Sequence, residues 1–341
     1  MYKKISFIFA LVMVLSLVLA ACGQQTVDCT KEDVFCVGQV TDVGEVDDKS
    51  FNQSAWEGLQ LAGDKLDANV DYIETKDAKD YGTNIELFAE KGYDVIVTVG
   101  FGLGDATREA AEKYPEIDFI GVDQWQSPDL PELDNLVGLL FPEWKAGFQA
   151  GALAGMLTET KLLAGVYGTD LVPAVVAFGE GFEDGASYID SEIEVITTYH
   201  PGGFATGFTD PEWGGATSKQ AIEQGADVIF AAGGKTGNGG LIETANYDGV
   251  YCIGVDSDQW ETVPEAHNCL VSSAMKLITP AVFDLISDSK DGAMPTGNYF
   301  GTVGLAPFHD FDGEISQDIK DTLAQIEADL LADVIKYDDF H

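Results

Sequence analysis

The chain has 341 residues, of which 45% are hydrophobic, so it is long enough for two globular domains with sizeable cores. Its 18 basic and 58 acidic residues give a formal net charge of −40, which excludes nucleic acid polymers as partners because like charges repel. The acidic residues are spread along the chain, which is typical of a hydrated surface in a saline environment.

The first 21 residues have the features of an export signal. Lys3 and Lys4 precede an apolar run over residues 5–18, and Leu-Ala-Ala then leads to Cys22. The segment resembles a bacterial lipoprotein signal, which implies cleavage before Cys22 and its acylation with lipid. The alternatives are an ordinary signal peptide and, less favoured because the run is short, a membrane-spanning helix. Residues 22–33 are then a lipidated tether on the extracytoplasmic face of the cell membrane.

Alternating apolar strands and helices predict a first α/β lobe. We expect strands at 34–40, 70–74, 95–100, 119–123 and 136–141, and helices from Ser50 as the cap, at 84–91 and at 105–114. A helix at 143–157 has Gly147, Gly151 and Gly155 at a spacing of four, which permits close packing against another helix. The chain is expected to cross to a second lobe at this helix.

The second lobe is predicted from a further series of apolar strands. We expect strands at 162–167, 193–199, 228–233, 251–256 and 270–275, a helix at 277–287, a strand at 299–305 and an acidic helix at 316–332. Recrossing near Lys276 and Phe300 would make a hinge of three connections. The expected lobes are therefore 34–141 plus 276–299 at the N-terminal side and 142–275 plus 300–341 at the C-terminal side.

An ungapped internal repeat supports two matching halves. Gly92 to Asp123 corresponds to Gly225 to Asp256 at a constant offset of 133 residues, and each copy ends a strand with aspartate. Open α/β sheets bind ligands beyond the carboxyl ends of their strands, so Asp123 and Asp256 are expected to face one crevice. The alternative is that both aspartates are helix caps.

The four remaining cysteines form two local pairs, Cys29 with Cys36 and Cys252 with Cys269. Two short-loop disulfides are the hypothesis, because an even number of cysteines suits an exported protein. The alternative is that each cysteine is buried as a small free thiol.

The sequence contains only incomplete versions of the motifs for catalysis and cofactor binding. Gly234-Lys235-Thr236 resembles the end of a phosphate loop, but Ile229 occupies the required first glycine. The glycine-rich stretches at 100–104 and 237–240 lack the last glycine of the dinucleotide fingerprint, and the four histidines have no metal-binding spacing. We therefore expect no enzyme, no cofactor and no metal.

One segment is more specific. Residues 40–59, VTDVGEVDDKSFNQSAWEGL, resemble the basic membrane protein family of bacterial lipoproteins, the purine nucleoside receptor-like substrate-binding proteins of ABC transporters. The resemblance continues through residues 225–234, 254–259 and 272–276. It implies a type I periplasmic-binding-protein fold, in which two Rossmann-like lobes joined by a three-strand hinge close on a nucleoside and deliver it to a permease with its ATPase. We expect a monomer.

The resemblance also implies which residues touch the ligand. Phe51 matches one of two rings that enclose the base, and Phe208 matches the other, with Phe204 as an alternative and core packing as a further one. The implied polar contacts are Asp256 and Lys276 to the ribose, Asp42, Asn52 and Asp123 to the base or the remaining hydroxyl, and the backbone of Gly233 and Gly234.

Two other functions remain open. The same fold suits a sensor that presents its closed form to a signalling receptor, and it suits a binding protein for a sugar or another small polar ligand. A ring from each lobe favours a flat base over a sugar.

Overall fold

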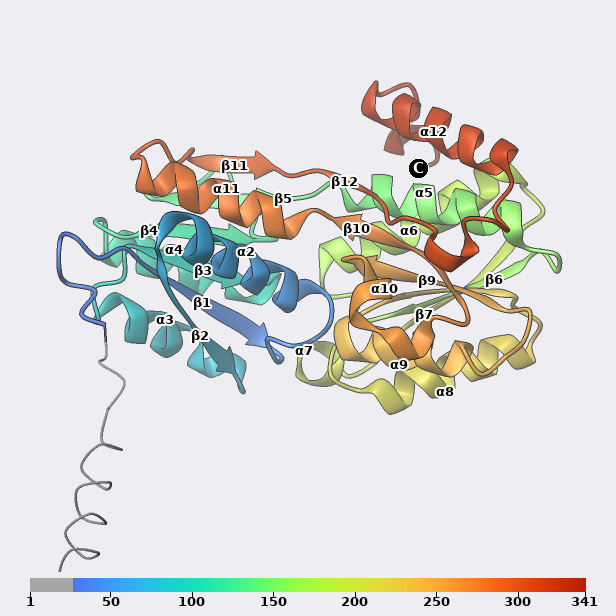
Figure 1. Cartoon of the computed structure of the whole chain (residues 1–341), viewed down its shortest axis with the longest axis horizontal. Helices are drawn as coiled ribbons and strands as arrows, with labels where there is room; N and C mark the ends of the chain where they lie inside the picture. The colour runs from blue at the N-terminus through green and yellow to red at the C-terminus, as the bar shows by residue number, and fades with distance from the viewer. Residues whose placement is uncertain (1–26) are drawn as a thin grey trace, which may run out of the picture.

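A computed structural model describes residues 27–341 of the chain, so the predicted leader and Cys22 lie outside the described residues. Figure 1 shows two α/β bodies, each built on one six-stranded sheet. We call them the first lobe and the second lobe. Within the described range, no helix combines the length and the apolar character that crossing a membrane requires.

The first lobe contains most of the N-terminal half of the chain. Its elements are β1 (Cys36–Val43), α2 (Phe51–Leu66), β2 (Asn69–Thr75), α3 (Tyr81–Ala89), β3 (Val95–Val99), α4 (Gly104–Lys113), β4 (Asp118–Val122) and β5 (Leu136–Leu140). With β11 (Gly297–Phe300) at one edge, the strand order is β11-β5-β4-β3-β1-β2, and every pair is parallel. The central strand β3 is wholly buried because helices cover both faces of a parallel sheet.

The second lobe repeats this plan. It contains α5 (Glu143–Leu157), β6 (Leu162–Tyr167), α6 (Pro173–Ile189), β7 (Glu194–Tyr199), α7 (Gly203–Thr206), α8 (Pro211–Glu223), β8 (Val228–Ala232), α9 (Gly234–Thr244), β9 (Tyr251–Asp256), α10 (Gln259–Thr262), β10 (Leu270–Lys276) and α12 (Gln317–Leu331). With β12 (Val303–Leu305) at one edge, the strand order is β12-β10-β9-β8-β6-β7, and the β12–β10 pair is antiparallel while the others are parallel.

Three connections join the lobes. The chain crosses from β5 to α5, returns from β10 to α11 (Ile278–Lys290), and crosses again between β11 (Gly297–Phe300) and β12 (Val303–Leu305). The prediction of one strand over 299–305 is wrong, because the chain changes sheets at residues 301–302 and forms a short strand in each. The lobe limits given above stay a prediction.

The glycine stripe of α5 packs directly on α6. A Cβ atom at Gly151 would lie 2.0 Å from the carbonyl oxygen of Phe182, and one at Gly185 would lie 2.0 Å from that of Phe148. The close helix contact predicted from the spacing of four is therefore confirmed. This contact holds α6 against the helix at the first crossing.

Ser50 occupies the N-cap position of α2, as predicted, but its side chain makes no capping hydrogen bond. The Asp48 carboxylate accepts the backbone N–H groups of Ser50, Asn52 and Gln53 at 3.0, 2.9 and 3.1 Å. The Ser50 hydroxyl instead donates to Asp256 Oδ2, 2.7 Å away in the second lobe. Asp48 provides the side-chain cap because its two oxygens reach three N–H groups at the helix start.

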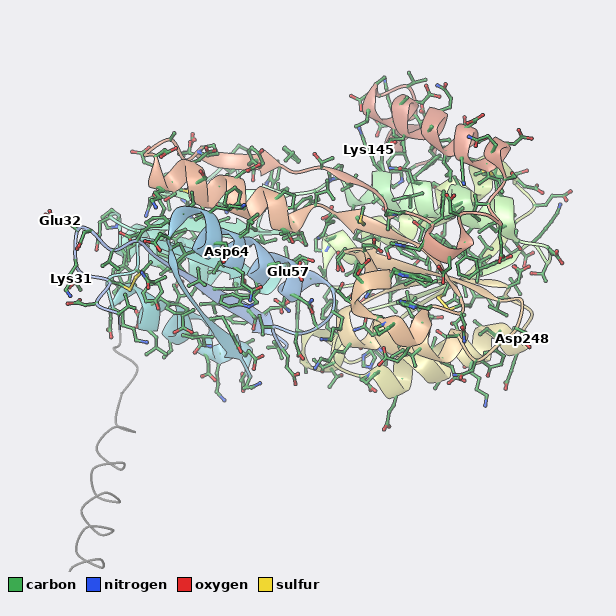
Figure 2. The ribbon with its side chains drawn as sticks, in the orientation of Figure 1. Lys31, Glu32, Glu57, Asp64, Lys145 and Asp248 are labelled. Carbon is green, nitrogen blue, oxygen red and sulfur yellow. A yellow bond between two sulfur atoms is a disulfide. The ribbon has the colours of Figure 1, made fainter. Side chains whose placement is uncertain are left out.

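Both cysteine pairs are bonded in the structure. The Cα atoms are 5.8 Å apart in Cys29–Cys36 and 5.0 Å apart in Cys252–Cys269. Figure 2 shows the side chains over both lobes, with Asp64 on the outside of α2 and Asp248 on the second lobe. Each is exposed, as expected for an acidic, hydrated surface.

Candidate ligand-binding cleft

One cleft between the lobes gathers all nine predicted binding residues. The first lobe lines it with Asp42, Val43, Gly44, Glu45, Asp48, Phe51, Asn52, Gly100, Phe101, Gly102 and Asp123. The opposite wall consists of Val172, Ala174, Val175, Phe178, Phe204, Phe208, Thr209, Ala232, Gly233, Gly234, Lys235, Val255, Asp256 and Lys276. The cleft lies beyond the carboxyl ends of the parallel strands, where such sheets bind ligands. The contacts of these residues with a ligand stay a prediction.

The two aspartates of the repeat have the same backbone conformation. Asp123 directly follows β4 with φ 59°, and Asp256 ends β9 with φ 64°. The alternative that they are helix caps is wrong, because Asp258 is the N-cap of α10 and Pro142 is the N-cap of α5. The left-handed turn lets each side chain line the cleft.

A buried lysine joins the lobes at the base of the cleft. Lys276 Nζ lies 2.6 Å from Asp123 Oδ2 and 3.2 Å from Glu143 Oε1, and its side chain is 2% exposed. The ammonium group also lies 4.6 Å from the centre of the Phe51 ring. Burial by itself lowers the pKa of Lys276, but the carboxylates of Asp123, Glu143 and Asp256 raise that pKa by more. Lys276 therefore stays charged.

Glu143 is a member of this cluster that the sequence reasoning missed. It is the first residue of α5 and approaches Lys276 only because the first crossing brings α5 beside β10. Burial raises the pKa of Glu143, although Lys276 opposes that shift. The one signal in the sequence was an acidic residue at the start of the crossing helix.

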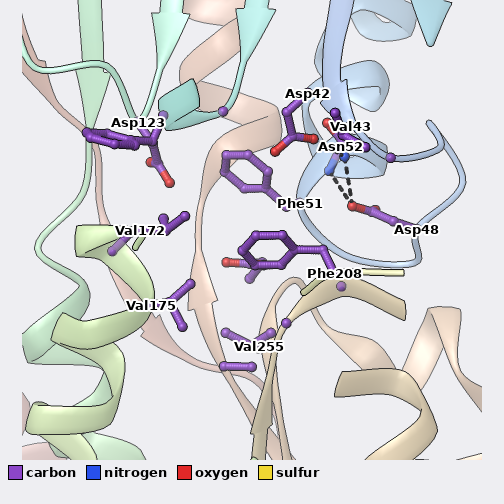
Figure 3. A pocket seen from close by; sticks show the side chains of 18 of the residues that line it. Asp42, Val43, Asp48, Phe51, Asn52, Asp123, Val172, Val175, Phe208 and Val255 are labelled. Carbon is purple, nitrogen blue, oxygen red and sulfur yellow. Dashed lines mark hydrogen bonds between the residues drawn. The ribbon is translucent and has the colours of Figure 1, made fainter. Parts of the chain in front are cut away.

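Asp42, Asn52 and Asp48 form a polar network on the first lobe. Asn52 Nδ2 donates to Asp42 Oδ1 and to Asp48 Oδ2, each at 3.2 Å, and Figure 3 shows Asn52 beside Asp48. Part of Asp42 reaches solvent through the cleft, yet burial of its carboxyl raises its pKa to about 7. Burial likewise raises the pKa of Asp48 to about 6.

Two buried oxygens in the cleft lack a hydrogen-bond partner among the described residues. They are Asn52 Oδ1 and Asp123 Oδ1. Because a buried acceptor without a partner is costly, these atoms are ready to accept N–H or O–H groups from a ligand.

Aromatic rings line the cleft from both lobes. Figure 3 shows Phe51 and Phe208 reaching into it, with Val172, Val175 and Val255 nearby. Phe208 packs so closely on the second lobe that a Cβ atom at Gly168 would lie 2.3 Å from its ring. Phe204 lines the same cleft, so both rings remain candidates for the second one. Both Phe51 and Phe208 also pack on the core, so the core-packing alternative describes only part of their surface.

Outside the cleft, residues 27–341 contain one group of three side chains that could hold a metal ion. Asp258, Glu261 and His309 bring their ligand atoms within 4.8 Å of one another, and His309 Nε2 lies 2.7 Å from Asp258 Oδ2. Sequence spacing missed this group because 51 residues separate Asp258 from His309.

Comparisons with known proteins agree with a binding cleft. Residues 35–301 match the family model described as ABC transporter substrate-binding protein PnrA-like. The chain is 32% identical to the CD4+ T-cell-stimulating antigen of Listeria monocytogenes, with 95% of each chain covered. It is 29% identical to the ABC transporter nucleoside-binding protein BmpA of Lactococcus lactis, with 97% of each covered.

Solved structures confirm the predicted two-lobed fold. An ABC transporter solute-binding protein from Aeropyrum pernix superposes with a TM-score of 0.78 at 22% identity, covering 89% of this chain and 92% of that one. At this identity the likeness concerns the fold alone.

Proposed function

The chain belongs to the Bmp family of PnrA-like ABC transporter substrate-binding proteins, and from this premise we propose that it captures purine nucleosides in the cleft and delivers them to a permease. The observation that carries the proposal is the meeting of Phe51 and Phe208, from opposite lobes, in a cleft that also contains buried carboxylates. A flat heteroaromatic base between two rings gains dispersion and excludes water. The name of the Lactococcus relative, a nucleoside-binding protein, supports the same ligand class.

The carboxylates suit the two ends of a nucleoside. Asp42 and Asn52 lie next to Phe51 on the first lobe, so we assign them, with Asp123, to the base or the remaining hydroxyl. Asp256 and Lys276 are assigned to the ribose, because a carboxylate accepts two hydrogen bonds from a vicinal diol. Gly234 has φ 54°, which favours glycine and leaves the backbone open to the ligand.

Binding would be coupled to delivery through closure of the lobes. A ligand that contacts both lobes stabilises their closed arrangement, and the permease and its ATPase would act on that closed form. The protein would act as a monomer, anchored through lipid on Cys22 at the outer face of the cell membrane. A sugar ligand is disfavoured by the two rings, and a sensor is disfavoured by membership of a transporter family.

Calorimetric titration of the mature chain in detergent at high salt tests the ligand. Guanosine, adenosine and inosine should bind with micromolar or tighter affinity, whereas ribose alone should not bind, and guanine and uridine rank the contributions of sugar and base. Folded protein that binds none of the nucleosides would contradict the proposal.

Alanine at the first ring tests the stacking. Phe51→Ala should weaken nucleoside binding by about 1 to 3 kcal/mol, because one face of the base loses its aromatic partner. Phe208→Ala and Phe204→Ala, titrated in parallel, decide which is the second ring. Phe300→Ala, at a ring that is 62% exposed near the hinge, is the matched control.

A further inference from the structure

The loop between β1 and α2 belongs to the first lobe but is held by the second. We call residues 44–50 the latch loop; Figure 1 shows it, in blue, on the side of the first lobe that faces the second. The backbone carbonyl of Lys49 accepts hydrogen bonds from three second-lobe side chains. The donors are Thr262 Oγ1 at 2.8 Å, Gln259 Nε2 at 3.3 Å and Ser257 Oγ at 3.4 Å. The Lys49 carbonyl thus binds three donors of the second lobe.

The neighbouring carbonyl is held as well. Asn238 Nδ2 donates to the oxygen of Asp48 at 2.8 Å, and Asn238 Oδ1 accepts from Gln259 Nε2 at 2.8 Å. Gln259 is fixed in turn, because its Oε1 accepts the backbone N–H of Val255 and its own N–H donates to Ser273 Oγ. Asn238 and Gln259 are buried, so the second lobe presents a rigid, preorganised receptor for the latch loop.

Side-chain contacts across the lobes add to this docking. Lys235 at the start of α9 pairs with Glu45 and Asp47 of the latch loop. The Ser50 hydroxyl donates to Asp256 Oδ2. Lys235 thus offsets the negative charge of Glu45 and Asp47, which the acidic second lobe would otherwise repel.

The docked loop leads directly into the cleft. The Asp48 carboxylate holds the start of α2 through three backbone N–H groups and also accepts from Asn52 Nδ2. Phe51 lies between these anchored residues in the chain. The docked position of the latch loop therefore sets the positions of Phe51 and Asn52 in the cleft. Among the described residues, Asn238, Gln259 and Thr262 are not part of the cleft lining.

We propose that Asn238, Gln259 and Thr262 are positioning residues that couple closure of the lobes to assembly of the base-binding side of the cleft. By donating hydrogen bonds to the carbonyls of Asp48 and Lys49, they hold Phe51 and Asn52 in place and slow release of the ligand. The effect on ligand release rests on the proposed function, whereas the docking contacts join protein atoms only.

Three variants of the full mature chain test the grip. Thr262→Val has nearly the same shape but lacks the hydroxyl donor, and Thr262→Ser restores that donor. Asn238→Asp keeps the acceptor for Gln259 but loses the donor to Asp48. The matched control is Asn246→Ala, because Asn246 Nδ2 donates only to carbonyls of its own lobe, those of Ile242 and Glu243.

Two measurements give independent readouts. In stopped-flow dissociation of guanosine, Thr262→Val should release ligand about fivefold faster and Asn238→Asp at least tenfold faster, while Thr262→Ser and Asn246→Ala stay within twofold of the wild type. In hydrogen exchange of the ligand-free protein, amides at 44–53 should exchange faster in Thr262→Val and Asn238→Asp only. The thermal midpoint of the ligand-free protein should stay unchanged, which separates opening of the latch from general destabilisation.

The outcomes separate this inference from the proposed function. If the wild type binds no nucleoside but exchange at 44–53 rises in Thr262→Val and not in Thr262→Ser, the proposed function fails and the docking stands. Equal exchange in all variants overturns the inference even when guanosine binds tightly. Equal acceleration of guanosine release by Thr262→Val and Thr262→Ser also overturns it, because the hydroxyl would then have no role.

Discussion

The two walls of the cleft follow one backbone plan but differ in chemistry. Thr41 in β1 pairs with Val99, and Tyr167 in β6 pairs with Ala232; Val99 and Ala232 are related by the offset of 133 residues that also relates Asp123 to Asp256. The residues that follow Thr41 and Tyr167 are therefore equivalent. They are Asp42 in the first lobe and Gly168 in the second.

This one difference changes the chemistry of the two walls at this position. Asp42 places a carboxylate at its position, whereas Gly168 leaves room there for the Phe208 ring. The adjacent backbone is tight in both lobes: a Cβ at Gly100 would lie 2.6 Å from Asp42 Oδ2, and one at Gly233 would lie 2.6 Å from the nitrogen of Gly168. At this position the shared scaffold thus carries a carboxylate in the first lobe and an aromatic ring in the second, which suits a ligand with a polar edge and flat faces.

The equivalent aspartates differ in their partners rather than in their backbone. Asp123 pairs with the Lys276 ammonium at 2.6 Å, whereas Asp256 accepts a hydrogen bond from the Ser50 hydroxyl at 2.7 Å. Asp123 is therefore tied to a buried ion pair, whereas Asp256 is held by a neutral hydroxyl donor from the other lobe.

Removing the shared cation should have the largest effect on this comparison. Lys276→Met should lower the free energy of unfolding by about 3 to 5 kcal/mol, because Asp123 and Glu143 stay buried without a counter-ion. Urea unfolding at constant pH and salt measures this.

Two further variants test the cause of that loss. Adding Asp123→Asn and Glu143→Gln to Lys276→Met should restore most of the stability, since neither side chain that contacted the ammonium group is then charged. Lys79→Met breaks only a surface pair with Asp77 and should leave unfolding unchanged. A Lys276→Met protein as stable as the wild type would show that the buried cluster does not depend on the ammonium.

The disulfide of the second half should have the next largest effect. Cys252 corresponds by the offset of 133 to Phe119, which pairs with Leu136 across β4 and β5, whereas Cys252 pairs with Leu270, the residue after Cys269. Replacing both cysteines with alanine should cost about 3 kcal/mol of stability, because the bond closes a loop of 17 residues. Urea unfolding of non-reduced protein measures the loss.

The shorter Cys29–Cys36 loop provides the comparison. It spans 7 residues, so replacing that pair should cost less, about 2 kcal/mol. A larger loss there than at Cys252 and Cys269 would contradict the argument from loop length.

The fold was largely predictable because its signals are local or periodic. Buried apolar strands such as 95–99, the repeat, and the glycine spacing of α5 each reflect packing that any α/β sheet requires. The helix-cap role of Asp48 was missed because nothing distinguishes it from Asp47 in an acidic loop. Its selection depends on which oxygen reaches the start of α2.

The cleft was predictable through the resemblance, but its long-range partners were not. Glu143 is 133 residues from Lys276, and Asn238 is 190 residues from Asp48. Such pairs arise only when the crossings bring the lobes together, and no pattern along the chain encodes them. The single strand expected at 299–305 failed for the same reason, since the change of sheet is a tertiary event.

Asp256→Asn sharpens the comparison of the two aspartates at the level of the ligand. It should weaken guanosine binding by about 2 kcal/mol and guanine binding much less, because the proposed partner of Asp256 is the ribose diol. Calorimetry with both ligands measures the difference. Equal losses for guanosine and guanine would overturn the ribose assignment. Asp123→Asn, at the equivalent place, should instead act mainly on stability through Lys276.

The smallest effect concerns Asp42, the residue that distinguishes the two walls. Burial raises the pKa of Asp42 from 3.8 to about 7, so the folded state holds this proton more tightly than the unfolded state does. Stability therefore falls as pH rises from about 4 to 7 and is constant above that range, as far as this group is concerned. Asp42→Asn cannot ionise, so it should be more stable than the wild type at pH 8 and equal to it at pH 4.

The gain at pH 8 should be about 1 kcal/mol, below the roughly 4 kcal/mol that the full shift implies, because solvent in the cleft screens the charge. Urea unfolding of the ligand-free protein at pH 4, 6 and 8 gives the profile, with the exposed Asp64→Asn as the flat control. The same variant should lose guanosine affinity at pH 8, since the carboxylate that destabilises the empty cleft is the one assigned to the base. A variant that gains stability without losing guanosine affinity would show that the Asp42 carboxylate affects folding stability and does not contact the ligand.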